Sequence, residues 1–167
     1  MNKNLLMLLF IIFPVLLYSQ EKIKFKNNLI AYSIKSEKIC FNNENNKVFI
    51  LINDPICTNC LNYSKNLVEK LTSNFNNEIK IFIVLHGSKN NLLFNKNTMI
   101  RFSNIFKDVN DYLFDFEDNK KTILRISKYK QSDFPIFIIM PKKSDYLWTG
   151  SYQLFDYDKL IRLFNLN

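Results

Sequence analysis

The segment from Lys47 to Phe75 most constrains the fold, because an apolar run in it leads into two closely spaced cysteines. The run Val48–Ile52 has the length and composition of a buried strand. Cys57 and Cys60 follow, with two residues between them. Apolar residues then recur with the period of a helix, at Leu67, Val68, Leu71 and Phe75. The pattern predicts an amphipathic helix over 57–75 that begins at the first cysteine.

The two cysteines are expected to differ in exposure and in charge. A sulfur at the start of a helix lies near unpaired backbone N–H groups and the positive end of the helix dipole, which favour a thiolate at Cys57. Cys60 lies one turn deeper and shares the apolar face of the predicted helix. An exposed thiolate attacks a disulfide, and a shielded thiol nearby resolves the mixed disulfide. The spacing therefore predicts a catalytic dithiol in which Cys57 attacks and Cys60 resolves.

At this arrangement of strand, C-x-x-C and helix, the chain resembles the thioredoxin-like superfamily, in particular its exported bacterial thiol-disulfide oxidoreductases. A second point of resemblance is Phe134-Pro135, where the proline opens a strongly apolar strand over 135–141. The resemblance implies that Pro135 is a cis-proline facing the dithiol. It also implies that the backbone of Phe134 pairs with an extended substrate. Ile56, directly before the first cysteine, completes the expected substrate-binding set.

The resemblance implies an α/β fold, with a central mixed sheet, helices on both faces and extra N-terminal strands. It covers about residues 40–166. The elements that we expect, besides the first helix, are strands at 23–25, 30–34, 47–52, 79–85, 135–141 and 146–149, a short edge strand at 112–116, and helices at 97–109, 122–129 and 156–166. The expected organisation is a signal segment over 1–19, an N-terminal extension over 20–39 and a thioredoxin-like domain over 40–167.

The N-terminal residues have the pattern of a secretory signal peptide. Lys3 precedes an apolar run from Leu5 to Leu17, and the small residue Ser19 follows. The run is shorter than the roughly 20 residues that span a membrane. We therefore expect export to the periplasm or the outside of the cell. The alternative is an uncleaved anchor, which would hold the domain at the membrane, facing the periplasm.

Cys40 is left over when Cys57 and Cys60 pair, because the chain has 3 cysteines. It lies in the run Lys38-Ile39-Cys40-Phe41, and we expect it to be a buried, inert strand residue. A regulatory or intermolecular disulfide is the alternative.

Composition argues against nucleic-acid binding and against a metal site. The 167 residues fit one globular domain, and the net charge of +8 comes from scattered lysines without a nucleic-acid-binding motif. A zinc site would need Cys40, Cys57, Cys60 and the sole histidine, His86, which is better explained as a strand-end residue. We therefore expect no metal, no other cofactor and no nucleic acid. The expected partners are protein thiols or disulfides and a redox partner protein.

Two features depart from the family pattern. The run Val48–Ile52 contains no carboxylate, although the family often has one on this strand to help move the proton of the resolving thiol. The dipeptide Thr58-Asn59 between the cysteines has no Pro, Gly or His. These departures leave open a second hypothesis, a non-catalytic thioredoxin-like binding module in which the Cys57–Cys60 bond is a structural staple.

Overall fold

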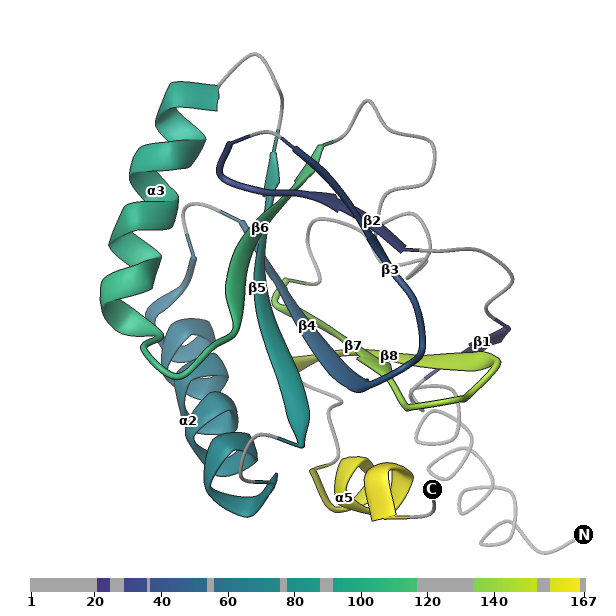
Figure 1. Cartoon of the computed structure of the whole chain (residues 1–167). Coiled ribbons are helices and arrows are strands. Elements are labelled where there is room, and N and C mark those ends of the chain that lie inside the picture. Colours follow the sequence, from purple (N-terminus) through teal and green to yellow (C-terminus); the bar gives the residue numbers. More distant parts are fainter. Residues whose placement is uncertain are drawn as a thin grey trace, which may run out of the picture.

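The computed structural model describes residues 21–24, 29–35, 37–53, 56–75, 78–87, 92–116, 134–152 and 157–165. These residues form strands and helices arranged around one sheet (Figure 1). The strands are β1 (Glu21–Lys24), β2 (Leu29–Tyr32), β3 (Lys38–Phe41), β4 (Asn46–Ile52), β5 (Ile79–Gly87), β6 (Asp111–Phe116), β7 (Ile136–Met140) and β8 (Tyr146–Ser151). The helices are α2 (Thr58–Phe75), α3 (Leu92–Ile105) and α5 (Tyr157–Asn165).

The sheet has eight strands in the order β1-β8-β7-β4-β5-β6-β2-β3. β4, β5 and β6 run parallel, and the remaining pairs are antiparallel. Parallel neighbours need a crossover, which α2 supplies between β4 and β5, and α3 between β5 and β6. The central mixed sheet and the extra N-terminal strands expected from the sequence are therefore present.

β4 lies in the middle of the sheet because both of its faces are apolar. Val48, Phe49, Ile50, Leu51 and Ile52 are all fully buried. Alternate side chains enter two separate core clusters, one on each face of the sheet. An uninterrupted apolar run is what a strand covered on both faces requires.

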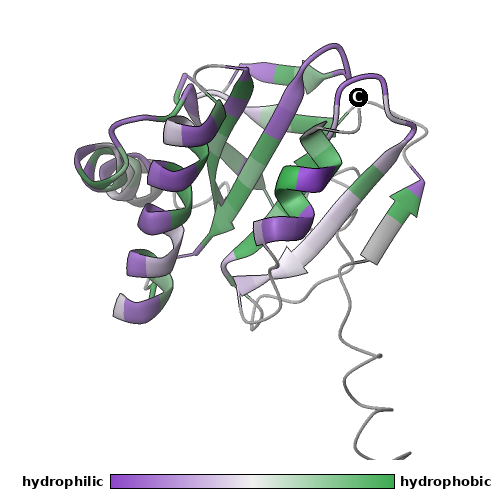
Figure 2. Cartoon of the chain, turned by 90° about the horizontal axis from the view of Figure 1, so that it is seen from below, coloured by the Kyte–Doolittle hydropathy of each residue, from purple (hydrophilic) through white to green (hydrophobic). Residues whose placement is uncertain are grey.

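The three described helices cover one face of the sheet. Residues of α2, α3 and α5 share a single core cluster with the strands, which we call the helix-side core. Figure 2 shows hydrophobic residues where these helices face the sheet and hydrophilic residues on their outer sides. The helix expected at 122–129 lies outside the described residues. α3 begins and ends earlier than the predicted 97–109.

The opposite face carries a second cluster, which we call the hairpin-side core, because the β2–β3 hairpin packs on it. Phe41 of β3 contacts the rings of Phe49 and Phe82, with centroids 5.0 Å away in each case. The prediction that 112–116 is an edge strand is wrong. β2 pairs with β6 at Tyr32 and Phe114, so that β6 lies inside the sheet.

Cys40 is exposed, so the expectation that it is buried is also wrong. It lies on β3, the last strand in the sheet order. Successive side chains of a strand point to opposite faces. Phe41 takes the buried side in the hairpin-side core, and Cys40 therefore points away from it.

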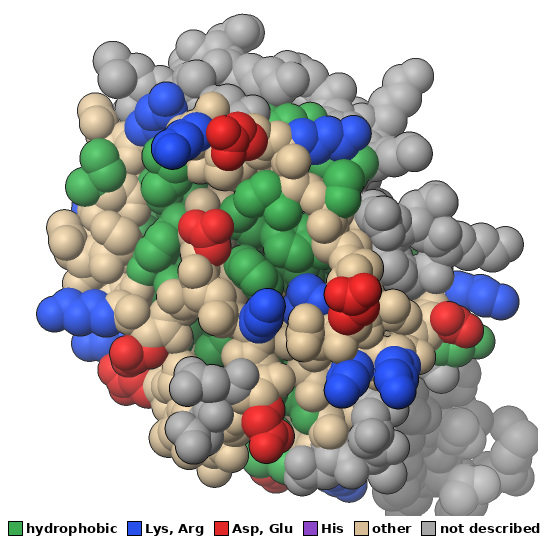
Figure 3. All heavy atoms as spheres, in the orientation of Figure 1, with side chains coloured by type: hydrophobic (Ala, Val, Ile, Leu, Met, Phe, Trp, Pro, Cys, Tyr) green, Lys and Arg blue, Asp and Glu red, His purple; other side chains and the backbone are tan. Residues whose placement is uncertain are grey.

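Of the helices that the structure describes, none is long and apolar enough to cross a membrane. The predicted signal segment, residues 1–19, lies outside the described residues. On the face shown in Figure 3, basic and acidic side chains are interspersed around an apolar area.

Candidate dithiol site

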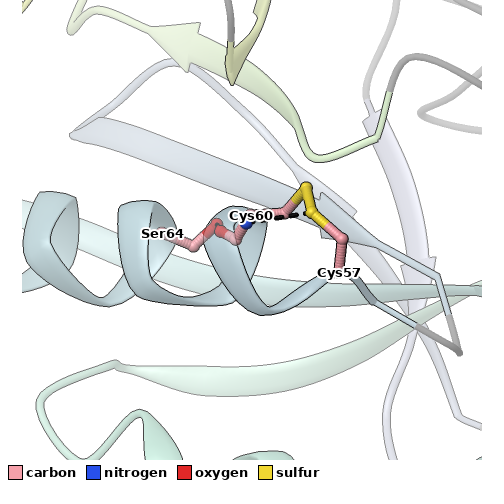
Figure 4. Close-up of a disulfide and its surroundings, with 3 residues drawn as sticks. All are labelled: Cys57, Cys60 and Ser64. Carbon is pink, nitrogen blue, oxygen red and sulfur yellow. Dashed lines mark hydrogen bonds between the residues drawn. A yellow bond between two sulfur atoms is a disulfide. The ribbon is translucent and has the colours of Figure 1, made fainter.

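Cys57 and Cys60 form a disulfide at the start of α2, with their Cα atoms 5.2 Å apart (Figure 4). This separation is in the usual range for a disulfide. Cys57 is exposed, whereas Cys60 retains only 6% of its accessible surface. The expected difference in exposure between the two residues is therefore present.

Cys57 is the N-cap residue of α2. Its carbonyl oxygen accepts a hydrogen bond from the backbone N–H of Leu61 at 2.9 Å, and its Sγ accepts one from the N–H of Cys60 at 3.1 Å. Asp, Asn and Ser side chains occupy this position in most helices and pair with the same otherwise unsatisfied N–H groups. The first turn of α2 contains no acidic residue to oppose negative charge. The local field therefore favours a thiolate at Cys57 once the disulfide is reduced.

Cys60 is held on the buried side of α2. The hydroxyl of Ser64, which is fully buried, donates a hydrogen bond to the carbonyl of Cys60 at 2.9 Å (Figure 4). The buried residues of α2 are Cys60, Ser64, Leu67, Val68, Leu71 and Phe75. The amphipathic pattern of the sequence therefore places Cys60 on the buried side of α2, whereas Cys57 is exposed.

Phe134 and Pro135 lie at the same end of the sheet as the disulfide. Leu51 of β4 pairs with Ile136, so the two residues before Ile136 lie level with the carboxyl end of β4, from which the chain continues to α2. The Phe134–Pro135 peptide bond is cis, and both residues are buried. The carbonyl of Pro135 accepts a hydrogen bond from the N–H of Tyr152 at 3.1 Å.

Tyr63 joins the dithiol helix to this segment. It lies on α2, three residues after Cys60, and its ring is 5.9 Å from that of Phe137 and 6.1 Å from that of Tyr152, centroid to centroid. Since Tyr152 bonds to Pro135, the helix and the proline are connected through one aromatic contact and one hydrogen bond. Sequence periodicity did not single out Tyr63, because its role depends on strands far along the chain.

Ile56, the third residue predicted to bind substrate, is half-buried and packs against the helix-side core. It lies next to Cys57 in the chain, whereas Phe134 and Pro135 reach this end of the sheet through the strand pairing. The substrate-binding role of all three residues stays a prediction.

Comparison with known proteins identifies the fold. No family model and no curated protein matches the sequence. Among solved structures, a DsbF homologue from Corynebacterium diphtheriae superposes with a TM-score of 0.60 at 13% identity, covering 87% of this chain and 92% of that one. A thioredoxin-like protein from Aeropyrum pernix gives 0.61 at 13% identity, covering 84% and 89%. A secreted disulfide oxidoreductase from Mycobacterium tuberculosis, homologous to E. coli DsbE, gives 0.55 at 10% identity, covering 83% and 96%.

The chain has a thioredoxin-like fold. At these identities the likeness concerns the fold, and it confirms the resemblance and the thioredoxin-like fold class inferred from the sequence. The sequence predicted helices on both faces of the sheet, whereas the described helices all lie on one face. The departure noted in the sequence is also present in the structure, because every residue from Val48 to Ile52 of β4 is apolar and buried.

A buried polar pair on β5 and β6 was not predicted. Nδ1 of His86 lies 3.2 Å from Oδ2 of Asp115, and the ring of His86 contacts that of Phe134. The sequence contained a usable signal, since an aspartate inside the apolar strand Asp111–Phe116 needs a partner when it is buried. His86 does lie near the end of β5, as expected, but it faces the interior.

The structure does not bring the residues of the zinc alternative together in the described part of the chain. Cys40 is exposed on β3, whereas His86 is buried on β5. In the described part of the chain, no three His, Cys, Asp or Glu side chains gather as metal ligands.

Proposed function

We propose that this thioredoxin-like protein is an exported thiol-disulfide oxidoreductase in which Cys57 attacks and Cys60 resolves. The observation that carries the proposal is the sulfur N-cap, an exposed Cys57 whose Sγ accepts the N–H of a buried Cys60. Such a microenvironment is typical of reactive rather than inert cysteines.

The reaction would proceed by two exchanges of sulfur partners. In the reduced protein, the Cys57 thiolate attacks one sulfur of a partner disulfide, and the other partner sulfur leaves as a thiolate. Cys60 then loses its proton and attacks the Cys57 sulfur, which releases the first partner sulfur as a second thiolate. The products are the Cys57–Cys60 disulfide and a partner dithiol that has gained two electrons. A dithiol on a redox partner protein restores the reduced form by the same exchanges in reverse.

Phe134 and Pro135 would position the protein partner. Pro135 has no N–H of its own, and its carbonyl is already paired with Tyr152. An extended partner segment would then pair with the backbone of Phe134, beside the sulfurs, as in other cases of strand addition. Ile56 would offer an apolar contact on the other side of Cys57.

Export is the second part of the proposal. It is supported by the N-terminal apolar run from Leu5 to Leu17 and by the secreted character stated for the similar M. tuberculosis protein. We propose a periplasmic or secreted domain, and a membrane-anchored one if the N-terminal segment is retained. N-terminal sequencing of the exported protein distinguishes the two.

Reduction of insulin by the protein, with dithiothreitol as electron donor, tests the activity. The wild type should accelerate precipitation of the insulin B chain, and Cys57→Ser should remove the acceleration. When the protein is reduced beforehand and mixed with insulin without dithiothreitol, Cys60→Ser should accumulate a mixed disulfide, because the resolving thiol is missing. Cys40→Ser is the matched control and should react like the wild type, since Cys40 lies on the outermost strand. Activity that survives Cys57→Ser would contradict the assigned role.

A static disulfide is the second candidate, and the apolar run Val48–Ile52 of β4 favours it, since that run offers no group to take up the Cys60 proton. The bond would then staple the start of α2 in a binding module, and no dithiol form would be needed.

A further inference from the structure

The buried pair of His86 and Asp115 is unusual for its surroundings. The two residues lie directly opposite each other on β5 and β6, and their side chains are 4% and 1% exposed. Their neighbours on this face of β5 and β6, Phe82, Val84 and Leu113, belong to the hairpin-side core. Burying two polar side chains among apolar ones is costly unless they are paired, so the pair is a defined structural feature.

The hydrogen bond fixes the orientation of the histidine ring. Nδ1 of His86 and Oδ2 of Asp115 lie 3.2 Å apart, so the ring and the carboxyl group share a hydrogen bond. A ring held at one nitrogen loses its freedom to flip, which defines the direction of its flat face.

That flat face lies against Phe134. The ring centroids of His86 and Phe134 are 5.7 Å apart, and the ring planes are inclined by 30°. The strand register explains why they meet. Leu51 of β4 pairs with Val84 on one side and with Ile136 on the other. Two residues beyond, His86 and Phe134 therefore face each other across the end of β4.

We propose that His86 and Asp115 are positioning residues for the partner-binding segment at Phe134. Asp115 orients the ring of His86, that ring supports the side chain of Phe134, and Tyr152 holds the next residue through its N–H. The backbone of Phe134 is thereby kept at the end of β4 from which the chain continues to the dithiol. This inference rests on the proposed function, because it assigns the pair to the binding of an extended protein partner rather than to the sulfur chemistry.

The experiment compares two disulfide substrates. One is a disulfide-bonded peptide, which has backbone on both sides of its half-cystine, and the other is hydroxyethyl disulfide, which has no peptide backbone.

His86→Phe keeps a flat ring but removes the ring nitrogens, and Asp115→Leu removes the carboxyl group. Both should raise KM for the peptide by about five- to tenfold, the effect of one lost orienting hydrogen bond. Reduction of hydroxyethyl disulfide should stay within about twofold of the wild type.

Two further variants separate positioning from general damage. Asp115→Asn preserves a hydrogen-bonding group opposite Nδ1 of His86 and should restore KM for the peptide to near the wild-type value. Tyr112→Phe is the matched control on the same strand, since it removes a hydroxyl bond near the opposite end of β6 and should leave both substrates unaffected. Equal losses toward both substrates, or an unchanged peptide KM in His86→Phe and Asp115→Leu, would overturn the proposal.

A spectroscopic measurement remains informative if the variants fail to fold or if the protein has no oxidoreductase activity. His86 is the only histidine, so the NMR signals of its ring are assigned without ambiguity. In protein carrying Cys40→Ser and Cys60→Ser, Cys57 is joined chemically to a thionitrobenzoate-activated peptide or to mercaptoethanol. The signal of His86 should shift with the peptide and not with mercaptoethanol. Equal signals in both adducts would contradict positioning, whereas a wild type inactive toward both disulfides would contradict only the proposed function.

Discussion

The backbone N–H of Cys60 donates a hydrogen bond to Sγ of Cys57 at 3.1 Å. The second cysteine of the motif therefore stabilises the first through its backbone, while its own sulfur is on the buried side of α2. The sulfur of Cys57 takes the place of the oxygen that usually caps a helix. Two cysteines in one turn thus supply both a helix cap and a disulfide.

The reduced Cys57 thiol should have a pKa below the ordinary value of about 8.5, because the helix N-terminus and the Cys60 N–H favour its thiolate. The rate of iodoacetamide alkylation against pH measures this pKa, in a Cys40→Ser background and with the modified site read by mass spectrometry. The same protein unfolded in urea is the control. Equal midpoints in the folded and unfolded protein would show that the helix has no effect on the thiol.

Tyr63 should couple the stability of α2 to the Pro135 segment. Tyr63→Ala removes ring contacts with Phe137 and Tyr152, and we expect it to lower the free energy of unfolding by about 2 kcal/mol. Tyr63→Phe keeps both contacts and should cost less than about 1 kcal/mol. Urea unfolding measures both changes. The same loss in both variants would mean that the hydroxyl, rather than the ring contacts, is responsible.

Tyr112 should contribute stability that depends on pH. Its hydroxyl donates to the carbonyl of Phe106, and burial raises its pKa, with a smaller contribution from the negative charge of Asp108. A raised folded pKa means that the contribution is complete below pH of about 10 and is lost as the pH rises through the folded value. Tyr112→Phe should therefore cost about 1 kcal/mol at pH 7 and less at pH 11, by urea unfolding. A cost that does not change with pH would refute this account.

Cys40 should be the one thiol that reacts in the oxidised protein. It is exposed on β3, while Cys57 and Cys60 are paired. Mass spectrometry after iodoacetamide treatment without reductant should show a single adduct, located on Cys40. A non-reducing gel tests the alternative of an intermolecular disulfide, since a dimer band that disappears in Cys40→Ser would establish it. Two or more adducts would show that the Cys57–Cys60 bond is not formed.

The central strand β4 and the helix α2 could be predicted because the local sequence of each has an unambiguous apolar pattern. Val48–Ile52 is apolar throughout because β4 is buried on both faces, and the stripe from Leu67 to Phe75 repeats with the period of a helix. The bounds of α3 were less accurate for a physical reason. Phe106 and Val109 pack on the helix-side core although they follow the helix, so they resemble another helical turn in the sequence.

The features that were predicted wrongly or not at all depend on strand pairing, which a single sequence does not specify. Cys40 is exposed because the neighbouring Phe41 takes the buried side of β3. The pairing of His86 with Asp115 needs the register of β5 and β6. The contact of His86 with Phe134 needs, in addition, the antiparallel addition of β7 to β4.

The reduction potential of the Cys57–Cys60 pair tests the central claim most directly. The protein is equilibrated with glutathione or dithiothreitol buffers of known ratio, and the dithiol is trapped with acid and counted by mass, with Cys40→Ser to remove the third thiol. A working oxidoreductase should have a potential between about −270 and −120 mV, the range of known dithiol enzymes. A potential below about −300 mV, the range of structural disulfides, would contradict the account and favour a static staple.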